Sequence, residues 1–132
     1  MQILLEFHSI VRWLIVLVSL LAVVKFALGW RRGGKFGQPD RALASGFGGL
    51  MDLQALLGIS YFVWSGLAEN SFPAYRLAHA GTMLAAVAVA HLPVRWKLAA
   101  DGLRYRNTLF AIVGALALVF VGVVLLPQGW LK

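Results

Sequence analysis

Four long apolar stretches constrain this chain more than any other feature of its sequence. They span approximately residues 8–30, 47–67, 74–92 and 108–127. Each is long enough to cross a hydrocarbon layer of roughly 30 Å. Backbone N–H and C=O groups must be hydrogen-bonded within lipid, so each stretch is expected to be a helix. The sequence therefore predicts an all-α fold, a single integral membrane domain built as a four-helix bundle.

The composition points to lipid as the solvent. Of the 132 residues, 61% are hydrophobic and 13% are charged, whereas soluble domains are about 45–50% apolar and about 25% charged. A chain this short cannot bury such an excess in its own core. The first residues, "MQILLEFHS", lack the basic region of a secretory signal, so the first stretch is expected to be a retained span.

The net charge of +7 is unevenly distributed along the chain. Basic residues are concentrated in the connections 31–41 and 93–107, while the connection 68–75 has none. Basic loops of membrane proteins stay in the cytoplasm, which predicts that both termini lie on the outer side. This distribution explains the charge without a nucleic-acid partner, and none is expected.

Two of the three histidines are predicted to lie at the same depth. His8 and His79 occupy the outer ends of the first and third spans, which places their rings within roughly 5 Å of each other along the membrane normal. His91 is about 18 Å deeper, at a rise of 1.5 Å per residue. Imidazoles from facing helices can hold a haem iron from both sides. Covalent c-type attachment is excluded because the chain has no cysteine.

An arginine accompanies each of these histidines on its own helical face. Arg12 is four residues after His8, and Arg76 is three residues before His79. A planar guanidinium pairs well with carboxylates, so both arginines are candidates for contacting haem propionates. Two other interpretations remain open. In one, the four side chains are ordinary interfacial residues that reach lipid headgroups; in the other, the histidines bind another metal or exchange protons.

The second span carries a polar stripe. Gln54, Gly58, Tyr61 and Ser65 recur at helical spacing and share one face. In a haem protein this face would line the pocket, and Gly58 would let a flat ring lie against the backbone. The same pattern is also typical of a packing seam with hydrogen bonds between helices.

Asp52 and His91 form a second polar set, toward the cytoplasmic side. An acidic residue within a span is a functional candidate by default, and the two residues are expected at similar depth. They could form a proton relay or part of a quinone headgroup site. Asp52 could also have a structural role or pair with Lys25.

Three segments carry a family resemblance: "FHSIVRW" at 7–13, "DLQALLGISYF" at 52–62 and "RLAHAGTMLAA" at 76–86. Together they make the chain resemble a family of small bacterial four-span proteins described as cytochrome b-like. The resemblance implies a four-helix bundle in the bacterial inner (cytoplasmic) membrane that binds b-type haem. Members often have a glutamate before the histidine of the third span, and here Ala78 stands at that position.

These observations predict a one-electron carrier with one haem b, held by His8 and His79 near the outer face. Quinone is a further candidate cofactor, through exchange of electrons with quinol. A single haem near one face cannot carry electrons across the whole membrane, so a redox protein partner or a homo-oligomer is expected. Two alternatives belong to other classes: a non-redox accessory or scaffold subunit, and a small proton- or metal-handling transporter that uses Asp52 and His91. Phosphate loops, dinucleotide fingerprints and hydrolase motifs are absent from the sequence.

Overall fold

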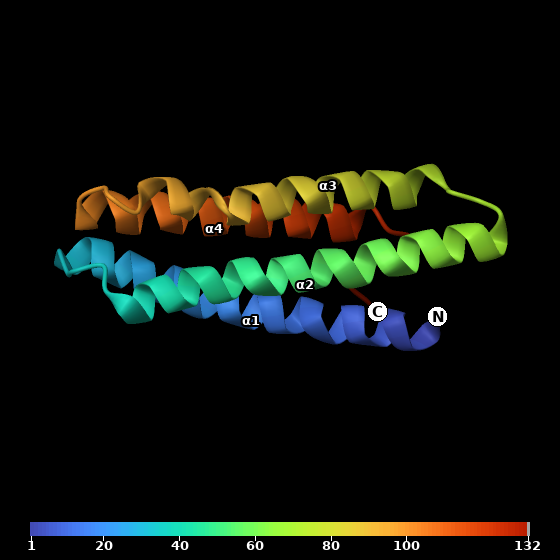
Figure 1. Ribbon diagram of the computed structural model, residues 1–132, viewed down its shortest axis with the longest axis horizontal. Helices are drawn as coiled ribbons and strands as arrows, with labels where there is room; N and C mark the ends of the chain where they lie inside the picture. Colours follow the sequence, from blue (N-terminus) through green and yellow to red (C-terminus); the bar gives the residue numbers. More distant parts are fainter. Residues whose placement is uncertain (132) are drawn as a thin grey trace.

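The computed structural model describes residues 1–131, and within that range its regular elements are all helical (Figure 1). In chain order these elements are α1 (Gln2–Arg32), α2 (Gln38–Glu69), α3 (Ala74–Ala90), the 3-10 helix η1 (Leu92–Trp96), α4 (Asp101–Val124) and the 3-10 helix η2 (Gly129–Leu131). The predicted all-α fold is confirmed. Four segments are long and apolar enough to cross a membrane, α3 and η1 counting together as one of them.

The helices extend beyond the apolar spans, most clearly at the start of α2. Gly37 is extended, with φ −104° and ψ −168°, and Pro39 follows in the first helical turn, a position where a missing backbone N–H costs nothing. The carboxylate of Asp40 accepts the Gly37 N–H at 2.9 Å, which caps the helix end. Polar residues at 38–46 are therefore helical, although the hydrophobic pattern alone starts this span near residue 47.

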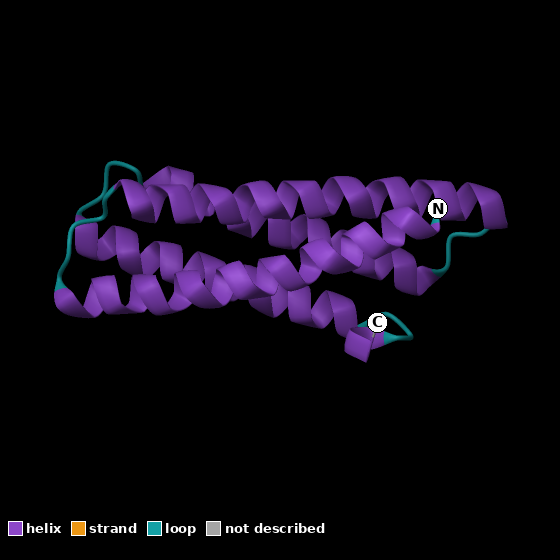
Figure 2. Ribbon diagram, turned by 90° about the horizontal axis from the view of Figure 1, so that it is seen from below, coloured by secondary structure: helices purple, strands orange, loops and turns teal. Residues whose placement is uncertain are grey.

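Consecutive helices run antiparallel and form a bundle. α1 packs against α2 and α4, and α3 packs against the same two helices, with the α2–α3 contact the least extensive of the four. Both termini lie at the same end as the α2–α3 connection (Figure 1). Loops occur at the ends of the bundle (Figure 2). The other end carries the two basic connections, and we call it the basic end.

The core combines small, aromatic and aliphatic side chains, and many large aliphatic side chains also cover the outside. Fully buried residues come from each of the four α-helices: Ala22 and Phe26 of α1, Phe47 of α2, Ala86 of α3, and Ile112 and Ala115 of α4. The outer surface holds Leu20, Leu21 and Val24, each more than half exposed. A soluble protein rarely exposes a continuous apolar surface of this kind, so this exterior fits a lipid environment and indicates a multi-pass membrane protein.

A buried carboxylate joins three helices at the basic end. Asp40 of α2 is 3% exposed and lies 2.6 Å from Nζ of Lys25 on α1. The Tyr105 hydroxyl on α4 lies 2.9 Å from Oδ2 of Asp40 and 2.8 Å from the carbonyl of Lys35, and it donates its one proton to one of these two acceptors. Gly29 allows the tyrosine ring to approach α1, since a Cβ there would lie 2.5 Å from Tyr105 Cε1.

Tyr105→Phe is expected to destabilise the bundle by about 1–3 kcal/mol, because a buried acceptor loses its donor. The free energy of unfolding can be measured in micelles by titration with a denaturing detergent, followed by circular dichroism. The control is Tyr75→Phe, at an exposed tyrosine, which should change stability by less than about 0.5 kcal/mol. Equal effects of the two substitutions would show that the Asp40 cluster does not stabilise the fold.

Candidate functional site

A cavity of about 480 Å³ lies between the four helices, in the half of the bundle that holds the termini. Its walls are mostly apolar and include Ile15, Met51, Met83, Val119 and Val123. Its polar lining brings together residues that are far apart in the sequence: His8, Arg12, Gln54, Gly58, Tyr61, Arg76 and His79. All seven predicted cofactor-contacting residues therefore border one space.

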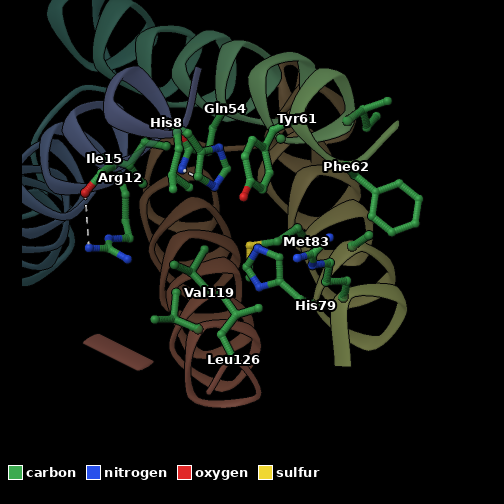
Figure 3. Close-up of a pocket in the computed structure, with 18 of the residues that line it drawn as sticks. His8, Arg12, Ile15, Gln54, Tyr61, Phe62, His79, Met83, Val119 and Leu126 are labelled. Carbon is green, nitrogen blue, oxygen red and sulfur yellow. Dashed lines mark hydrogen bonds between the residues drawn. The ribbon is translucent and has the colours of Figure 1, made fainter. Parts of the chain in front are cut away.

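His8 and His79 face each other across this cavity. Their ring centroids are 6.4 Å apart, and the ring planes make an angle of 71°. In Figure 3 both rings turn toward the same space, and the hydroxyl of Tyr61 points into it from α2. Matched depth on α1 and α3 thus brings the two rings together, as the sequence predicts. Their role as metal ligands stays a prediction.

The hydrogen bond of His79 fixes which of its nitrogens carries the proton. Nδ1 lies 2.7 Å from the carbonyl oxygen of Gly122 on α4. A carbonyl can only accept, so Nδ1 is the donor and Nε2 has the lone pair. Gly122 lies against α3, where a Cβ would meet the terminal methyl of Met83, at 2.1 Å. Metal-binding histidines are typically oriented by such a bond to a backbone carbonyl.

His8 has the same protonation pattern for a different reason. Its Nε2 lies 3.2 Å from the amide nitrogen of Gln54; with the amide in this orientation Nε2 accepts and Nδ1 carries the proton. That Nδ1 is buried and has no hydrogen-bond partner among residues 1–131. Gly58 provides the space for the ring, since a Cβ there would lie 3.0 Å from His8 Cε1.

The cavity therefore contains two imidazoles that both carry their lone pair on Nε2. A pair of this kind can bind an electron-pair acceptor such as a metal ion, or accept hydrogen bonds. The separation of 6.4 Å between the ring centroids leaves room for one small atom between the two imidazoles.

The two arginines lie at the cavity in different surroundings. Arg12 is buried, lies 3.4 Å from the hydroxyl of Ser9, and has its guanidinium 5.4 Å from the ring centroids of Trp13 and Trp130. Arg76 forms an ion pair of 2.9 Å with Glu69. Sequence reasoning missed Glu69, although the short connection between α2 and α3 could have indicated it.

The polar stripe of α2 divides between a pocket wall and a packing seam. Gln54, Gly58 and Tyr61 line the cavity. Ser65 lies beyond the cavity, is fully buried, and accepts a hydrogen bond from Arg76 at 3.2 Å. The stripe therefore forms a cavity wall over its first three residues and a hydrogen-bonded contact between helices at Ser65.

Asp52 and His91 lie outside the cavity and pair with each other. Oδ1 of Asp52 is 2.7 Å from Nε2 of His91, and both side chains are about half exposed. Lys25 pairs with Asp40, so the proposed contact between Asp52 and Lys25 does not form. Gly48 lies against the His91 ring, where a Cβ would come within 3.3 Å of Cε1.

No group of three or more His, Cys, Asp or Glu side chains in the described part of the chain could hold a metal ion. Any metal at His8 and His79 would need further ligands from a bound group. No family model, curated protein or solved structure matches this chain. The resemblance to cytochrome b-like proteins therefore rests on the three segments of this sequence alone.

The hydrogen bonds predict that His8 and His79 are both neutral and protonated at Nδ1. Nitrogen NMR of protein labelled with ¹⁵N-histidine, in bicelles near neutral pH, distinguishes the two tautomers by the chemical shifts of the ring nitrogens. His8→Ala and His79→Ala assign the signals. A signal of either residue with the proton on Nε2 would contradict the geometry described above.

Proposed function

We propose that this protein is a four-span membrane cytochrome of the b type, a one-electron carrier that holds one haem between His8 and His79. The observation that carries the proposal is the pair of imidazoles at one cavity, with ring centroids 6.4 Å apart. Haem iron supplies a ferric/ferrous couple when it is bound between two such rings.

The lining of the cavity supports this ligand class. Pockets for cofactors are typically about 300–1,000 Å³, mostly apolar, with a few converging polar groups, and the cavity of 480 Å³ has this character. Gly58 leaves room beside His8 where any larger residue would meet the ring. The ring of His8 is held by packing and by the contact of its Nε2 with Gln54. Its buried Nδ1 has no hydrogen-bond partner among residues 1–131.

Four polar residues around the cavity have a definable task in this proposal. The Gly122 carbonyl keeps His79 oriented through Nδ1. The amide of Gln54, which contacts Nε2 of His8, would turn away to free that nitrogen. Arg12 and Arg76 would pair with the two propionates. Arg76 would pair with a propionate while it also keeps its ion pair with Glu69, in which Nη1 and Oε2 are 2.9 Å apart.

The proposed setting is the bacterial inner membrane, with both termini and the haem toward the outer side. The two basic connections would then face the cytoplasm. Two histidine ligands leave no open position on the iron, so electron transfer is favoured over oxygen chemistry. Electrons would pass to a partner, either a second redox protein or another copy of this chain, and membrane quinol is a candidate donor.

Purified protein supplied with haem is expected to show a Soret band that shifts on reduction with dithionite. His8→Ala and His79→Ala should each abolish this band or convert it to a five-coordinate spectrum. The matched control is His91→Ala, since His91 lies outside the cavity and pairs with Asp52. This variant should retain the wild-type spectrum.

Folded protein that stays colourless with haem would refute the proposal and favour a non-redox scaffold subunit. Loss of the band in His91→Ala as severe as in His79→Ala would also contradict the assigned ligands. A small transporter predicts instead that Asp52→Asn abolishes proton-coupled flux in liposomes while haem has no effect.

Arg12→Gln is expected to weaken haem binding roughly 10–100-fold while leaving the six-coordinate spectrum unchanged, because the lost hydrogen bond is to a charged group. Arg76→Gln should have a smaller effect, since Arg76 already shares its charge with Glu69. Affinities can be compared by titrating the haem-free protein. Unchanged affinity in Arg12→Gln would exclude it as a propionate ligand.

A further inference from the structure

Basic side chains from two distant parts of the sequence gather at the basic end of the bundle. The connections 33–37 and 91–100 lie at the same end in Figure 1 and Figure 2. Oδ1 of Asp101, at the start of α4, accepts the N–H of Phe36 at 3.2 Å, and the guanidinium of Arg104 lies 4.3 Å from the centroid of the Phe36 ring. This end carries eight cations that we call the basic cluster: Arg31, Arg32, Lys35, Arg41, Arg95, Lys97, Arg104 and Arg106.

The cations of the basic cluster lack acidic partners. Among residues 1–131, none of the eight forms an ion pair with a carboxylate. Carboxylates at this end are engaged otherwise: Asp40 pairs with Lys25 and is 3% exposed, and Asp101 accepts the N–H of Phe36. Six of the eight basic side chains are exposed. The cluster is therefore an uncompensated positive surface that can bind anions from outside the chain.

Apolar side chains project next to these cations. Val94 and Leu98, in the connection between α3 and α4, are 68% and 93% exposed. Arg95, Trp96 and Lys97 stand between them in the chain. Water disfavours exposed apolar side chains, whereas the boundary between lipid headgroups and acyl chains accommodates apolar and cationic side chains together and is enriched in tryptophan. This connection therefore fits the headgroup layer of a membrane.

The charge of the cluster selects among lipids. A zwitterionic headgroup carries its own cation beside the phosphate, so it would leave the charge of the cluster uncompensated. A headgroup with a net negative charge compensates it, and clusters of about four to eight Lys or Arg next to a span are typical of surfaces that bind anionic lipids. Six of the eight cations are arginines, whose planar fork pairs with two phosphate oxygens at once.

We propose that the basic cluster binds anionic phospholipids, whose phosphates pair with its cations while their acyl chains pack against the apolar side chains beside it. Val94 and Leu98 hold the connection at headgroup depth, so that Arg95 and Lys97 meet the phosphates of the same leaflet. An acidic protein could match the charge, but it would not account for these two apolar side chains. The proposal is independent of haem, because none of the eight basic residues lines the cavity.

Tryptophan fluorescence tests the proposal, because the two ends of the bundle carry different tryptophans. Replacing Trp13, Trp64 and Trp130 with phenylalanine leaves Trp30 and Trp96 as a basic-end reporter. The reporter is reconstituted in phosphatidylcholine liposomes that contain either brominated phosphatidylglycerol or the same amount of brominated phosphatidylcholine. Bromine on the acyl chains quenches a tryptophan that it contacts, and the two quenchers differ in headgroup alone. We expect phosphatidylglycerol to associate roughly threefold or more tightly than phosphatidylcholine.

Substitutions at the same end locate the binding surface. In the basic-end reporter, Arg95→Gln combined with Lys97→Gln should lower the preference for phosphatidylglycerol roughly twofold or more, since two cations are lost. The matched control combines Gln38→Ala with Ser45→Ala, which changes two exposed uncharged side chains of α2. This control should keep the full preference.

A complementary reporter examines the opposite end of the bundle. It keeps Trp13, Trp64 and Trp130 and has phenylalanine in place of Trp30 and Trp96. Both brominated lipids should quench it equally. Native mass spectrometry of the unsubstituted chain is a second measurement, and an equimolar mixture of the two lipids should give roughly threefold more adducts with phosphatidylglycerol.

Equal quenching of the basic-end reporter by the two lipids, with equal adducts in native mass spectrometry, would overturn the proposal and favour an acidic protein as the partner of this surface. A preference of equal size in the complementary reporter would also overturn it. So would a preference that inorganic phosphate abolishes at an ionic strength where chloride does not, because the cluster would then bind free anions. These measurements need no haem, so a failure of the haem proposal would leave them interpretable.

Discussion

Polar groups in this bundle lie in surroundings where water cannot solvate them, and their pairing determines how the helices fit together. Asp40 is satisfied by Lys25, Tyr105 and the Gly37 N–H, which ties α1, α2 and α4 at the basic end. His79 is satisfied by Gly122, which ties α3 to α4 near the opposite end. An unpaired buried polar group costs far more than an apolar one, so the helices have little freedom to rotate or slide.

Much of this arrangement follows from the sequence. Four spans are predictable because lipid allows little besides helices, and the meeting of His8 with His79 follows from equal depth on helices that start at the same end. The pairing of Lys25 with Asp40 was not predicted, because Asp40 belongs to a segment that the hydrophobic pattern treats as a loop. The partner of Arg76 was missed for a related reason, since Glu69 lies past the apolar part of α2.

The protonation pattern of the cavity could not be predicted at all from spacing. It depends on which atom each imidazole nitrogen faces, and therefore on helix rotation to within a fraction of a turn. Gly58 leaves the space in which the His8 ring lies against α2, and Gly122 supplies the backbone carbonyl that faces His79. In the sequence both glycines resemble ordinary packing residues.

The buried Nδ1 of His8 has no hydrogen-bond partner among residues 1–131, and this carries an energetic cost. A scaffold gains nothing from a buried imidazole with one unpaired donor, which costs about 1–3 kcal/mol. A leucine at that position would fill the same space without this cost. The same bundle gives Asp40 two donors, the Lys25 ammonium and the Gly37 N–H, so its packing is capable of pairing a buried polar group. In the proposed function, haem would bind His8 at Nε2 and leave Nδ1 unpaired, so the free energy of haem binding would have to exceed this cost.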